Sequence, residues 1–376
     1  MLRFMIKLIR FIKFLIFFVI ILIITFYLFL NYYYQFGGSP DKYSREIITN
    51  SKNFNEDGFV NIYDIPKFKL DKNQKKQIDP SLKDWFFPPE NKNPSNPLPS
   101  ILFNKDLLTE SKFSWLGHST VLINTDSTII MTDPVFNRAS PIPIIGKPFL
   151  YHNVTSYKDL PEIDVVLISH DHYDHLDAKA MVELSNKVGF FIVPLGVKGH
   201  LVRWGIDPNQ IKELDWYEKY FHKDINFVLT PAHHFSGRGL SDHNKTLWGS
   251  WVIQSKNLNL FFSGDSGYTD LFKKIGNDYG PFDLAFIECG GYNSHWADVH
   301  MFPYEVVQAN IDLRSKVFVP ISWAKFDLSL HSWDEPIIRV SNEAKNRDQT
   351  IGSPMIGEVF DLKTIPTNHW WKNYQP

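Results

Sequence analysis

The chain has 376 residues, of which 44% are hydrophobic and 15% aromatic, so it can bury a large core and does not have a disordered composition. Its formal net charge is -2, and no Lys/Arg block lies beyond the extreme N-terminus, which excludes a nucleic-acid surface built on a cationic stripe. Cys289 is the single cysteine, so neither an internal disulfide nor a cysteine-type zinc site can form.

The N-terminal segment is predicted to be a membrane anchor. Residues 14–30 are apolar except for Thr25, and a run of roughly 17–20 such residues can span a bilayer. The flanking charges predict a single-pass protein with its N-terminus in the cytoplasm and the rest outside, because four basic residues precede the run: Arg3, Lys7, Arg10 and Lys13. A cleaved signal peptide is the alternative, but the tyrosines at 32–34 do not provide the small residues of a cleavage site. The opposite orientation would place the domain in the cytoplasm.

Composition divides the whole chain into three parts. Residues 1–36 are assigned to the anchor, and residues 37–110 to a polar, proline-containing arm that is expected to pack on the domain, with the Trp-Phe-Phe sequence at 85–87 among its contacts. Residues 111–376 are assigned to the domain. There, short apolar runs predict strands at 113–116, 120–124, 128–132, 163–168, 190–193, 225–229, 248–254, 258–263, 284–288 and 317–321. Helices are predicted at 178–188 and 305–313, so the fold class is α/β with two sheets.

A cluster of metal-ligand residues follows the predicted strand at 163–168. His170, His172, Asp174 and His175 lie within six positions. Imidazole nitrogen and carboxylate oxygen are the ligands that suit zinc and similar divalent metals. Because chemistry in an open α/β sheet sits at the carboxyl ends of strands, this placement predicts a metal site and not a solvated loop.

Three polar residues elsewhere in the chain also come directly after predicted strands. His234 comes after the strand predicted at 225–229, Asp265 lies in a Gly-containing turn after 258–263, and Asp133 follows 128–132. His234 and Asp265 are therefore expected to complete the metal site. The alternatives are an ordinary core or surface histidine for His234 and a turn-capping carboxylate for Asp265.

These motifs together resemble the metallo-β-lactamase-fold hydrolases, and within them the N-acyl-phosphatidylethanolamine-hydrolysing phospholipase D group and its bacterial relatives. The similarity runs from about residue 112 to about residue 340. Besides the His-rich cluster, the matching stretches are WLGHSTVLI (115–123), TDPVF (132–136), RASP (138–141), VPLG (193–196), ELDW (213–216), NKTLWGSW (244–251), GDSGY (264–268) and GPFDLA (280–285). The resemblance implies a four-layer αβ/βα sandwich behind the N-terminal helix.

The resemblance also implies a ligand set and a reaction. Two Zn²⁺ ions are expected, the first held by His170, His172 and His234, the second by Asp174 and His175, with Asp265 between them. A metal-bound hydroxide would then attack a phosphodiester of an N-acyl phospholipid. The residues expected to take part in catalysis are Asp265, Asp174 and His300.

The chain departs from the family pattern at the last metal ligand. That ligand is a histidine followed by tryptophan, whereas here the late strand ends in Ser322-Trp323, and Lys325 replaces a small polar residue. A hydroxyl is a poor substitute for imidazole at zinc. The first Zn²⁺ is therefore expected to be secure, and the second to bind more weakly.

Each of the remaining polar residues is consistent with either a functional or an ordinary structural role. Arg138 and Arg238 are expected to bind substrate because guanidinium groups suit phosphate, and surface salt bridges are the alternative. His331 is expected to approach the substrate or the vacant ligand position, and an ordinary hydrogen-bonded histidine is the alternative. The same holds for His300. His118 is expected to support a metal ligand or the turn around it, and direct binding to the metal is the alternative.

Three functions follow from this sequence. The first is a membrane-anchored, zinc-dependent phosphodiesterase of phospholipase D type whose partner is a lipid or another phosphodiester. The second is a one-metal hydrolase of another ester, lactone or phosphoester. The third is a metal-binding envelope protein that Ser322 has weakened as a catalyst. The sequence predicts no nucleic-acid partner and indicates no oligomeric state.

Overall fold

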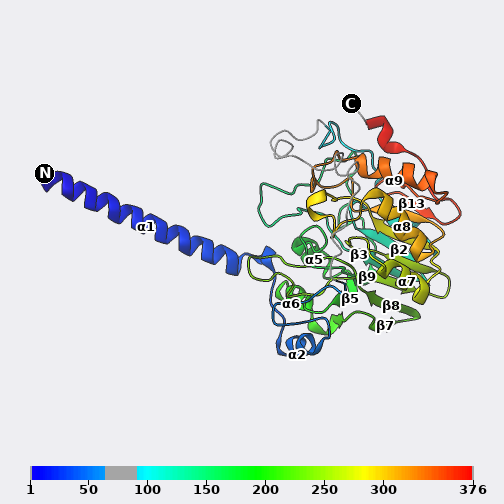
Figure 1. Ribbon diagram of the computed structural model, residues 1–376, viewed down its shortest axis with the longest axis horizontal. Coiled ribbons are helices and arrows are strands. Elements are labelled where there is room, and N and C mark those ends of the chain that lie inside the picture. The colour runs from blue at the N-terminus through cyan, green and yellow to red at the C-terminus, as the bar shows by residue number, and fades with distance from the viewer. Residues whose placement is uncertain (1, 64–90, 375–376) are drawn as a thin grey trace.

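A computed structural model describes residues 2–63 and 91–374, and the predicted packing of residues 85–87 lies outside this part. Two mixed sheets face each other across the core (Figure 1). The first has the strand order β13-β1-β2-β3-β4-β5-β6: Val359–Asp361, Lys112–Trp115, Val121–Thr125, Thr128–Thr132, Ile163–Leu167, Val188–Pro194 and Ile211–Leu214. The second has the order β12-β11-β10-β9-β8-β7: Phe318–Ile321, Leu284–Glu288, Asn259–Phe262, Ser250–Gln254, Ile225–Thr230 and Lys219–His222.

Helices cover the outer face of each sheet. The first sheet packs against α5 (Ala178–Leu184) and α6 (Lys198–Arg203), and the second against α7 (Leu271–Tyr279), α8 (Pro303–Leu313) and α9 (Glu335–Asn346). Apolar side chains from both sheets fill the space between them; the rings of Phe113 and Phe286, for example, lie 6.0 Å apart. The four-layer αβ/βα arrangement expected from the sequence is therefore confirmed.

The parallel strand pairs explain why polar residues gather at one edge. In the first sheet β3 runs parallel to β4, and in the second β10 runs parallel to β11 and β11 to β12. Strand β8 is antiparallel to β9, which is antiparallel to β10, so β8 and β10 also end at the same edge. The residues that follow all these strands consequently face one another across the two sheets.

Most of the predicted strands are present with ends shifted by one or two residues, and two of them, 128–132 and 284–288, have the predicted bounds. The helix predicted over 178–188 is too long. It ends at Leu184, and Val188 instead begins β5, where it pairs with Ile163 of β4. The β-branched Val188 is better suited to this ladder than to a helix end. The sequence did not predict β6, β7, β13, α6, α7 or α9.

The described part of the arm contains regular secondary structure. It contains α2 (Lys42–Asn50), whose Ile48 is buried, and Phe59 and Leu98 are buried as well. Backbone hydrogen bonds tie it to the domain, from Phe59 to the Asn244 carbonyl at 2.8 Å and from Leu98 to the Leu150 carbonyl at 2.7 Å. These bonds and buried side chains attach the described residues of the arm to the rest of the chain.

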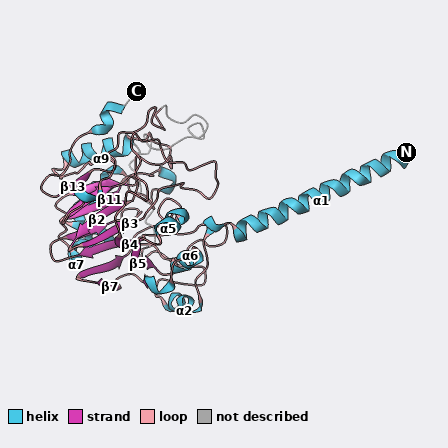
Figure 2. Cartoon of the chain, turned by 180° about the vertical axis from the view of Figure 1, so that it is seen from behind, coloured by secondary structure: helices cyan, strands magenta, loops and turns pink. Residues whose placement is uncertain are grey.

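Helix α1 (Leu2–Tyr32) projects away from the domain in both views (Figures 1 and 2). Within its 28 residues from Arg3 to Leu30, a stretch of 18 residues has a mean hydropathy of 2.8 and is not buried by the rest of the protein. By length and composition it is able to cross a membrane. Its exit is fixed to the domain, because the indole of Trp204 donates to the Tyr34 carbonyl at 2.7 Å.

One indole joins the two sheets near the edge where the polar residues gather. Trp251 of β9 is fully buried and donates through Nε1 to the carbonyl of Ile168, which directly follows β4, at 3.0 Å. Trp251→Phe keeps the ring but leaves this carbonyl unpaired. We expect the free energy of unfolding to fall by about 1–3 kcal/mol, as measured by urea denaturation of the full chain in detergent. Phe221→Leu, at a 67% exposed position on β7, is the control. Equal stability of Trp251→Phe and the wild type would contradict this account.

Candidate metal site

Three imidazoles converge at the carboxyl ends of β4 and β8. His170 Nε2 lies 2.9 Å from His172 Nδ1, which in turn lies 3.2 Å from His234 Nε2. The outward nitrogens of two rings are engaged elsewhere, His170 Nδ1 with the Ser169 hydroxyl at 2.9 Å and His234 Nδ1 with the Val299 carbonyl at 3.0 Å. The nitrogens that face one another are therefore arranged as metal ligands are, with the other ring atom held in place.

The electrostatic environment keeps these rings neutral. Burial lowers the pKa of His170 and of His234 well below the usual value, and the neighbouring imidazoles lower it further. Burial also lowers the pKa of His172. Neutral imidazoles offer lone pairs to a cation, so this cluster suits a divalent metal with nitrogen ligands.

A second group adjoins the first and contains carboxylates. His175 Nε2 lies 3.0 Å from Asp265 Oδ2 and 3.5 Å from Asp174 Oδ2. This nitrogen is buried and has no hydrogen-bond partner in the described part of the chain. Burial opposes ionisation of Asp265, but the charge of His175 holds the carboxyl pKa well below its usual value. An anionic carboxylate beside an unpartnered imidazole nitrogen fits a metal cation between them.

Gly264 brings Asp265 to this group. Its φ of 58° lies in the left-handed region, and a Cβ there would come within 2.6 Å of the Ser169 side chain. Only glycine allows the turn after β10 to approach the His-rich loop so closely. The sequence signal, a carboxylate between glycines, is explained by this contact.

A buried carboxylate fixes the loop of residues 169–177 through hydrogen bonds to Ser169 and His175. Asp133, at the end of β3, accepts from the Ser169 backbone at 2.7 Å, from the Ser169 hydroxyl at 2.5 Å and from His175 Nδ1 at 2.8 Å. The last bond leaves His175 Nε2 directed into the site. Burial raises the pKa of Asp133, and its bonds to His175 and Ser169 oppose that rise.

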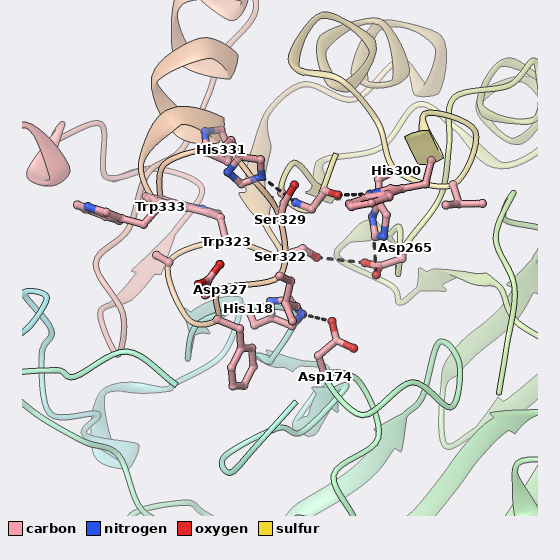
Figure 3. Close-up of a pocket in the computed structure, with 18 of the residues that line it drawn as sticks. His118, Asp174, Asp265, His300, Ser322, Trp323, Asp327, Ser329, His331 and Trp333 are labelled. Atoms are coloured by element: carbon pink, nitrogen blue, oxygen red, sulfur yellow. Dashed lines mark hydrogen bonds and ion pairs between the residues drawn. The ribbon is translucent and has the colours of Figure 1, made fainter. Parts of the chain in front are cut away.

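Ser322 occupies the position that the sequence comparison with the family pattern indicated. It follows β12 with a φ of 63°, and its hydroxyl lies 2.7 Å from Ser119 Oγ and 3.4 Å from Asp265 Oδ1 (Figure 3). Lys325 points elsewhere, because its ammonium group donates to the carbonyls of Leu116 and Val135. Its pKa is lowered to about 7 by burial.

A cavity of about 290 Å³ opens beside the second group (Figure 3). His300 and His331 both line it, as expected of residues that approach a substrate. His300 Nδ1 lies 3.6 Å from Glu288 Oε2 and 3.9 Å from Asp265 Oδ2, whereas His331 Nε2 accepts from the Gly291 backbone at 3.2 Å. Apolar and aromatic side chains form much of the remaining wall: Phe235, Trp296, Val299, Trp323, Phe326, Leu328 and Trp333.

The two arginines predicted to bind substrate do not line this cavity. Arg138 borders a separate pocket beside residues 33–35 and donates to the Ile145 carbonyl at 3.3 Å. Arg238 is buried, and its guanidinium donates to the carbonyls of Asp171, Leu176 and Gln35. It thereby joins the C-terminal end of α1 to the loop of residues 169–177. Neither guanidinium group faces the cavity.

Sequence reasoning missed two supports of the site. Asn61, in the arm, exchanges two hydrogen bonds with the backbone of His234, at 2.9 and 3.2 Å. Glu288 beside His300 was also missed. Asp171, inside the His-rich cluster, is buried and accepts from the Gly237 backbone at 2.8 Å and from the Thr246 hydroxyl at 2.8 Å.

Asp133→Asn tests whether the buried carboxylate supports the metal site. The amide is similar in shape, but it has one oxygen in place of two, so it cannot accept all three hydrogen bonds. It also lacks the negative charge that polarises His175. We expect the metal affinity of the second group to fall by roughly 10–100-fold, as measured by competition with a chromophoric chelator. Asp164→Asn, at the opposite end of β4, is the control. Unchanged affinity in Asp133→Asn would contradict the supporting role.

The chain is similar in sequence to known protein families and to individual proteins. A family model described as the beta-lactamase superfamily domain matches residues 128–323. An uncharacterized protein of Mycobacterium tuberculosis is 38% identical over 341 residues, which cover 87% of this chain and 89% of that protein. The N-acyl-phosphatidylethanolamine-hydrolyzing phospholipase D 1 of Caenorhabditis elegans is 38% identical over 229 residues, 57% of this chain and 64% of that enzyme.

The fold is also similar to a solved structure. A metallo hydrolase from the archaeon Ignicoccus hospitalis matches with a TM-score of 0.51 and 21% identity, over 66% of this chain and 97% of that one. The family model and the mycobacterial relative establish the relationship by sequence, and the two facing sheets with a His/Asp site at their edge establish it by structure. The chain therefore belongs to the metallo-β-lactamase superfamily of metal-dependent hydrolases.

Proposed function

We propose that the protein is a zinc-dependent phosphodiesterase of phospholipase D type that acts on N-acyl phospholipids. The observation that carries the proposal is the pair of adjoining ligand groups, one of three imidazoles and one with two carboxylates, beside an apolar cavity. Nitrogen and carboxylate ligands suit Zn²⁺. The similarity to the Caenorhabditis elegans phospholipase D supports the substrate class.

The bound metal ions would supply Lewis acidity toward the phosphate and lower the pKa of water at the site. His170, His172 and His234 would hold the first ion, Asp174 and His175 would hold the second, and Asp265 would be shared between them. The ligand atoms of His170, His175 and Asp265 all lie within 4.8 Å of one another. Each of these side chains is buried or half-buried, so bulk water has little access to the reacting atoms.

The reaction breaks one phosphorus–oxygen bond. Water oxygen forms a bond to phosphorus, and the bond from phosphorus to the ethanolamine oxygen breaks. The leaving oxygen takes up a proton, so the products are phosphatidic acid and an N-acylethanolamine. His300 is the group on the cavity wall that we assign to hold this proton, because Glu288 and Asp265 raise its pKa to about 9 against the effect of burial.

The cavity wall suits a lipid with a polar centre. Trp296, Trp323 and Phe326 provide apolar surface, and Asp174 and Asp265 lie at its polar end. Lys92 also lines the cavity and pairs with Asp327 at 3.2 Å. This combination of an apolar wall and a few polar groups is typical of small-molecule sites.

Helix α1 is proposed to anchor the domain at the bilayer that contains the substrate. The basic residues before the apolar run favour a cytoplasmic N-terminus and an extracytoplasmic domain. Bonds from Trp204 and Arg238 to the carbonyls of Tyr34 and Gln35 fix the domain close to the end of the helix. A domain held this way meets lipids without leaving the membrane surface.

The proposal is tested with an N-acyl-phosphatidylethanolamine in mixed micelles. The wild type should release phosphatidic acid and N-acylethanolamine, and water labelled with ¹⁸O should place the label in the phosphatidic acid. Release of fatty acid, or of no product by a metal-loaded protein, would contradict the assignment. Hydrolysis of a soluble phosphodiester or a lactone alone would instead favour the second function expected from the sequence.

Asp265→Ala should reduce hydrolysis by at least about 10³-fold, because it removes the carboxylate that lies next to both ligand groups. The measurement is initial rate at saturating metal, with far-ultraviolet circular dichroism to confirm folding. Asp278→Ala, which removes an exposed carboxylate from α7, is the matched control. Activity of Asp265→Ala comparable to the control would mean that the site is misplaced.

A further inference from the structure

The second ligand group lacks an imidazole at the end of β12. Asp174, His175 and Asp265 supply three ligands, and the hydroxyl of Ser322 is occupied with Ser119 at 2.7 Å. A neutral hydroxyl in a hydrogen bond is a weak ligand for a borderline metal. The group therefore has room for another ligand, and the inference below rests on the proposed metal-dependent function.

His118 brings an imidazole to this group from the first sheet, whereas the missing ligand would come from β12 of the second sheet. His118 follows β1 in the turn before β2, and its Nε2 lies 3.0 Å from Asp174 Oδ2 (Figure 3). The ligand atoms of His118, Asp174 and His175 all lie within 4.8 Å of one another. His118 is 4% exposed, so its ring is not a solvated surface group.

The distances match the edges of a tetrahedral site. Ligands about 2.1 Å from a tetrahedral Zn²⁺ are separated by about 3.4 Å. Here the separations are 3.0 Å from His118 Nε2 to Asp174 Oδ2, 3.5 Å from Asp174 Oδ2 to His175 Nε2, and 3.0 Å from His175 Nε2 to Asp265 Oδ2. The ligand atoms of His118, Asp174 and His175 thus lie close together, and Asp265 adjoins them through His175.

The backbone holds His118 in this position. Its φ of 51° lies in the left-handed region, which non-glycine residues rarely adopt because it is strained. Two donors fix its carbonyl, the indole of Trp115 at 2.7 Å and the backbone N–H of Ser322 at 3.0 Å. Phe326 packs edge-on against its ring at 5.3 Å. The residue that replaces the missing ligand therefore also helps to position His118.

We propose that His118 is the imidazole ligand of the second metal, in the place left by Ser322. The site would then have the ligands His118, Asp174, His175 and Asp265, and would hold a metal without a histidine at the end of β12. This reverses the expectation that the second metal is weakly bound and that His118 only supports its neighbours.

The alternative is that His118 only positions Asp174 through the hydrogen bond between them. Two variants separate these roles. His118→Ala removes both the ligand and the hydrogen bond. His118→Gln keeps an amide N–H that can donate to Asp174, but an amide is a poor ligand for zinc or cobalt.

The experiment titrates the metal-free full chain with Co²⁺ and follows both the number of ions bound and the visible absorption of the second one. The wild type should bind two ions tightly. His118→Ala and His118→Gln should both weaken the second by on the order of 100-fold or more, with loss of its intense tetrahedral absorption. Ser322→Ala is the control and should leave both ions in place. Adding Ser322→His to His118→Gln should restore the second ion.

Each other result decides against a specific claim. A His118→Gln variant that retains the affinity and absorption of the second Co²⁺ would overturn the ligand role and leave the proposed function intact. A wild type that binds one ion tightly would do the same. A wild type that binds no ion at the His170 group would overturn the proposed function itself.

Discussion

The buried carboxylate of Asp133 is the interaction on which the rest of the site depends. It lies at the end of β3, and through Ser169 and His175 it fixes the loop that follows β4. Because β3 and β4 are parallel, one carboxylate can span the ends of both strands. The orientation of His175 follows from that bond, and the geometry of the second ligand group follows from His175. A carboxylate in an apolar core is costly unless its bonds are satisfied, and here they are.

Helix α1 and the arm are connected to the loops that carry the ligand groups. Arg238 bonds simultaneously to the exit of α1 and to the backbone on both sides of His175, while Asn61 bonds to the backbone of His234. The segment before residue 111 therefore contacts the site as well as linking helix α1 to it. Its hydrogen bonds help to set the positions of residues in both ligand groups, so changes in the arm are expected to reach the site through the backbone.

The sequence was sufficient for features that depend on local pattern. Strand β4 and the cluster that begins at His170 could be recognised from an apolar run followed by closely spaced ligands, and Asp265 from its glycine turn. Contacts between distant segments could not be recognised this way. Nothing in the residues around Asn61 indicates that it meets His234, and Arg238 resembles a phosphate ligand until its three carbonyl partners are seen. Packing of the two sheets, and not spacing, decides these roles.

A metal-dependent hydrolase of this superfamily with an altered ligand set is the account that the structure supports, and the position of the bound ions is its most direct test. Anomalous diffraction from crystals of the zinc-loaded protein, collected on both sides of the zinc absorption edge, would locate them. The account predicts two peaks, one among His170, His172 and His234 and one within bonding distance of His118 and His175. A single peak at the first position would contradict the altered ligand set, and no peak at either would contradict the metal site as a whole.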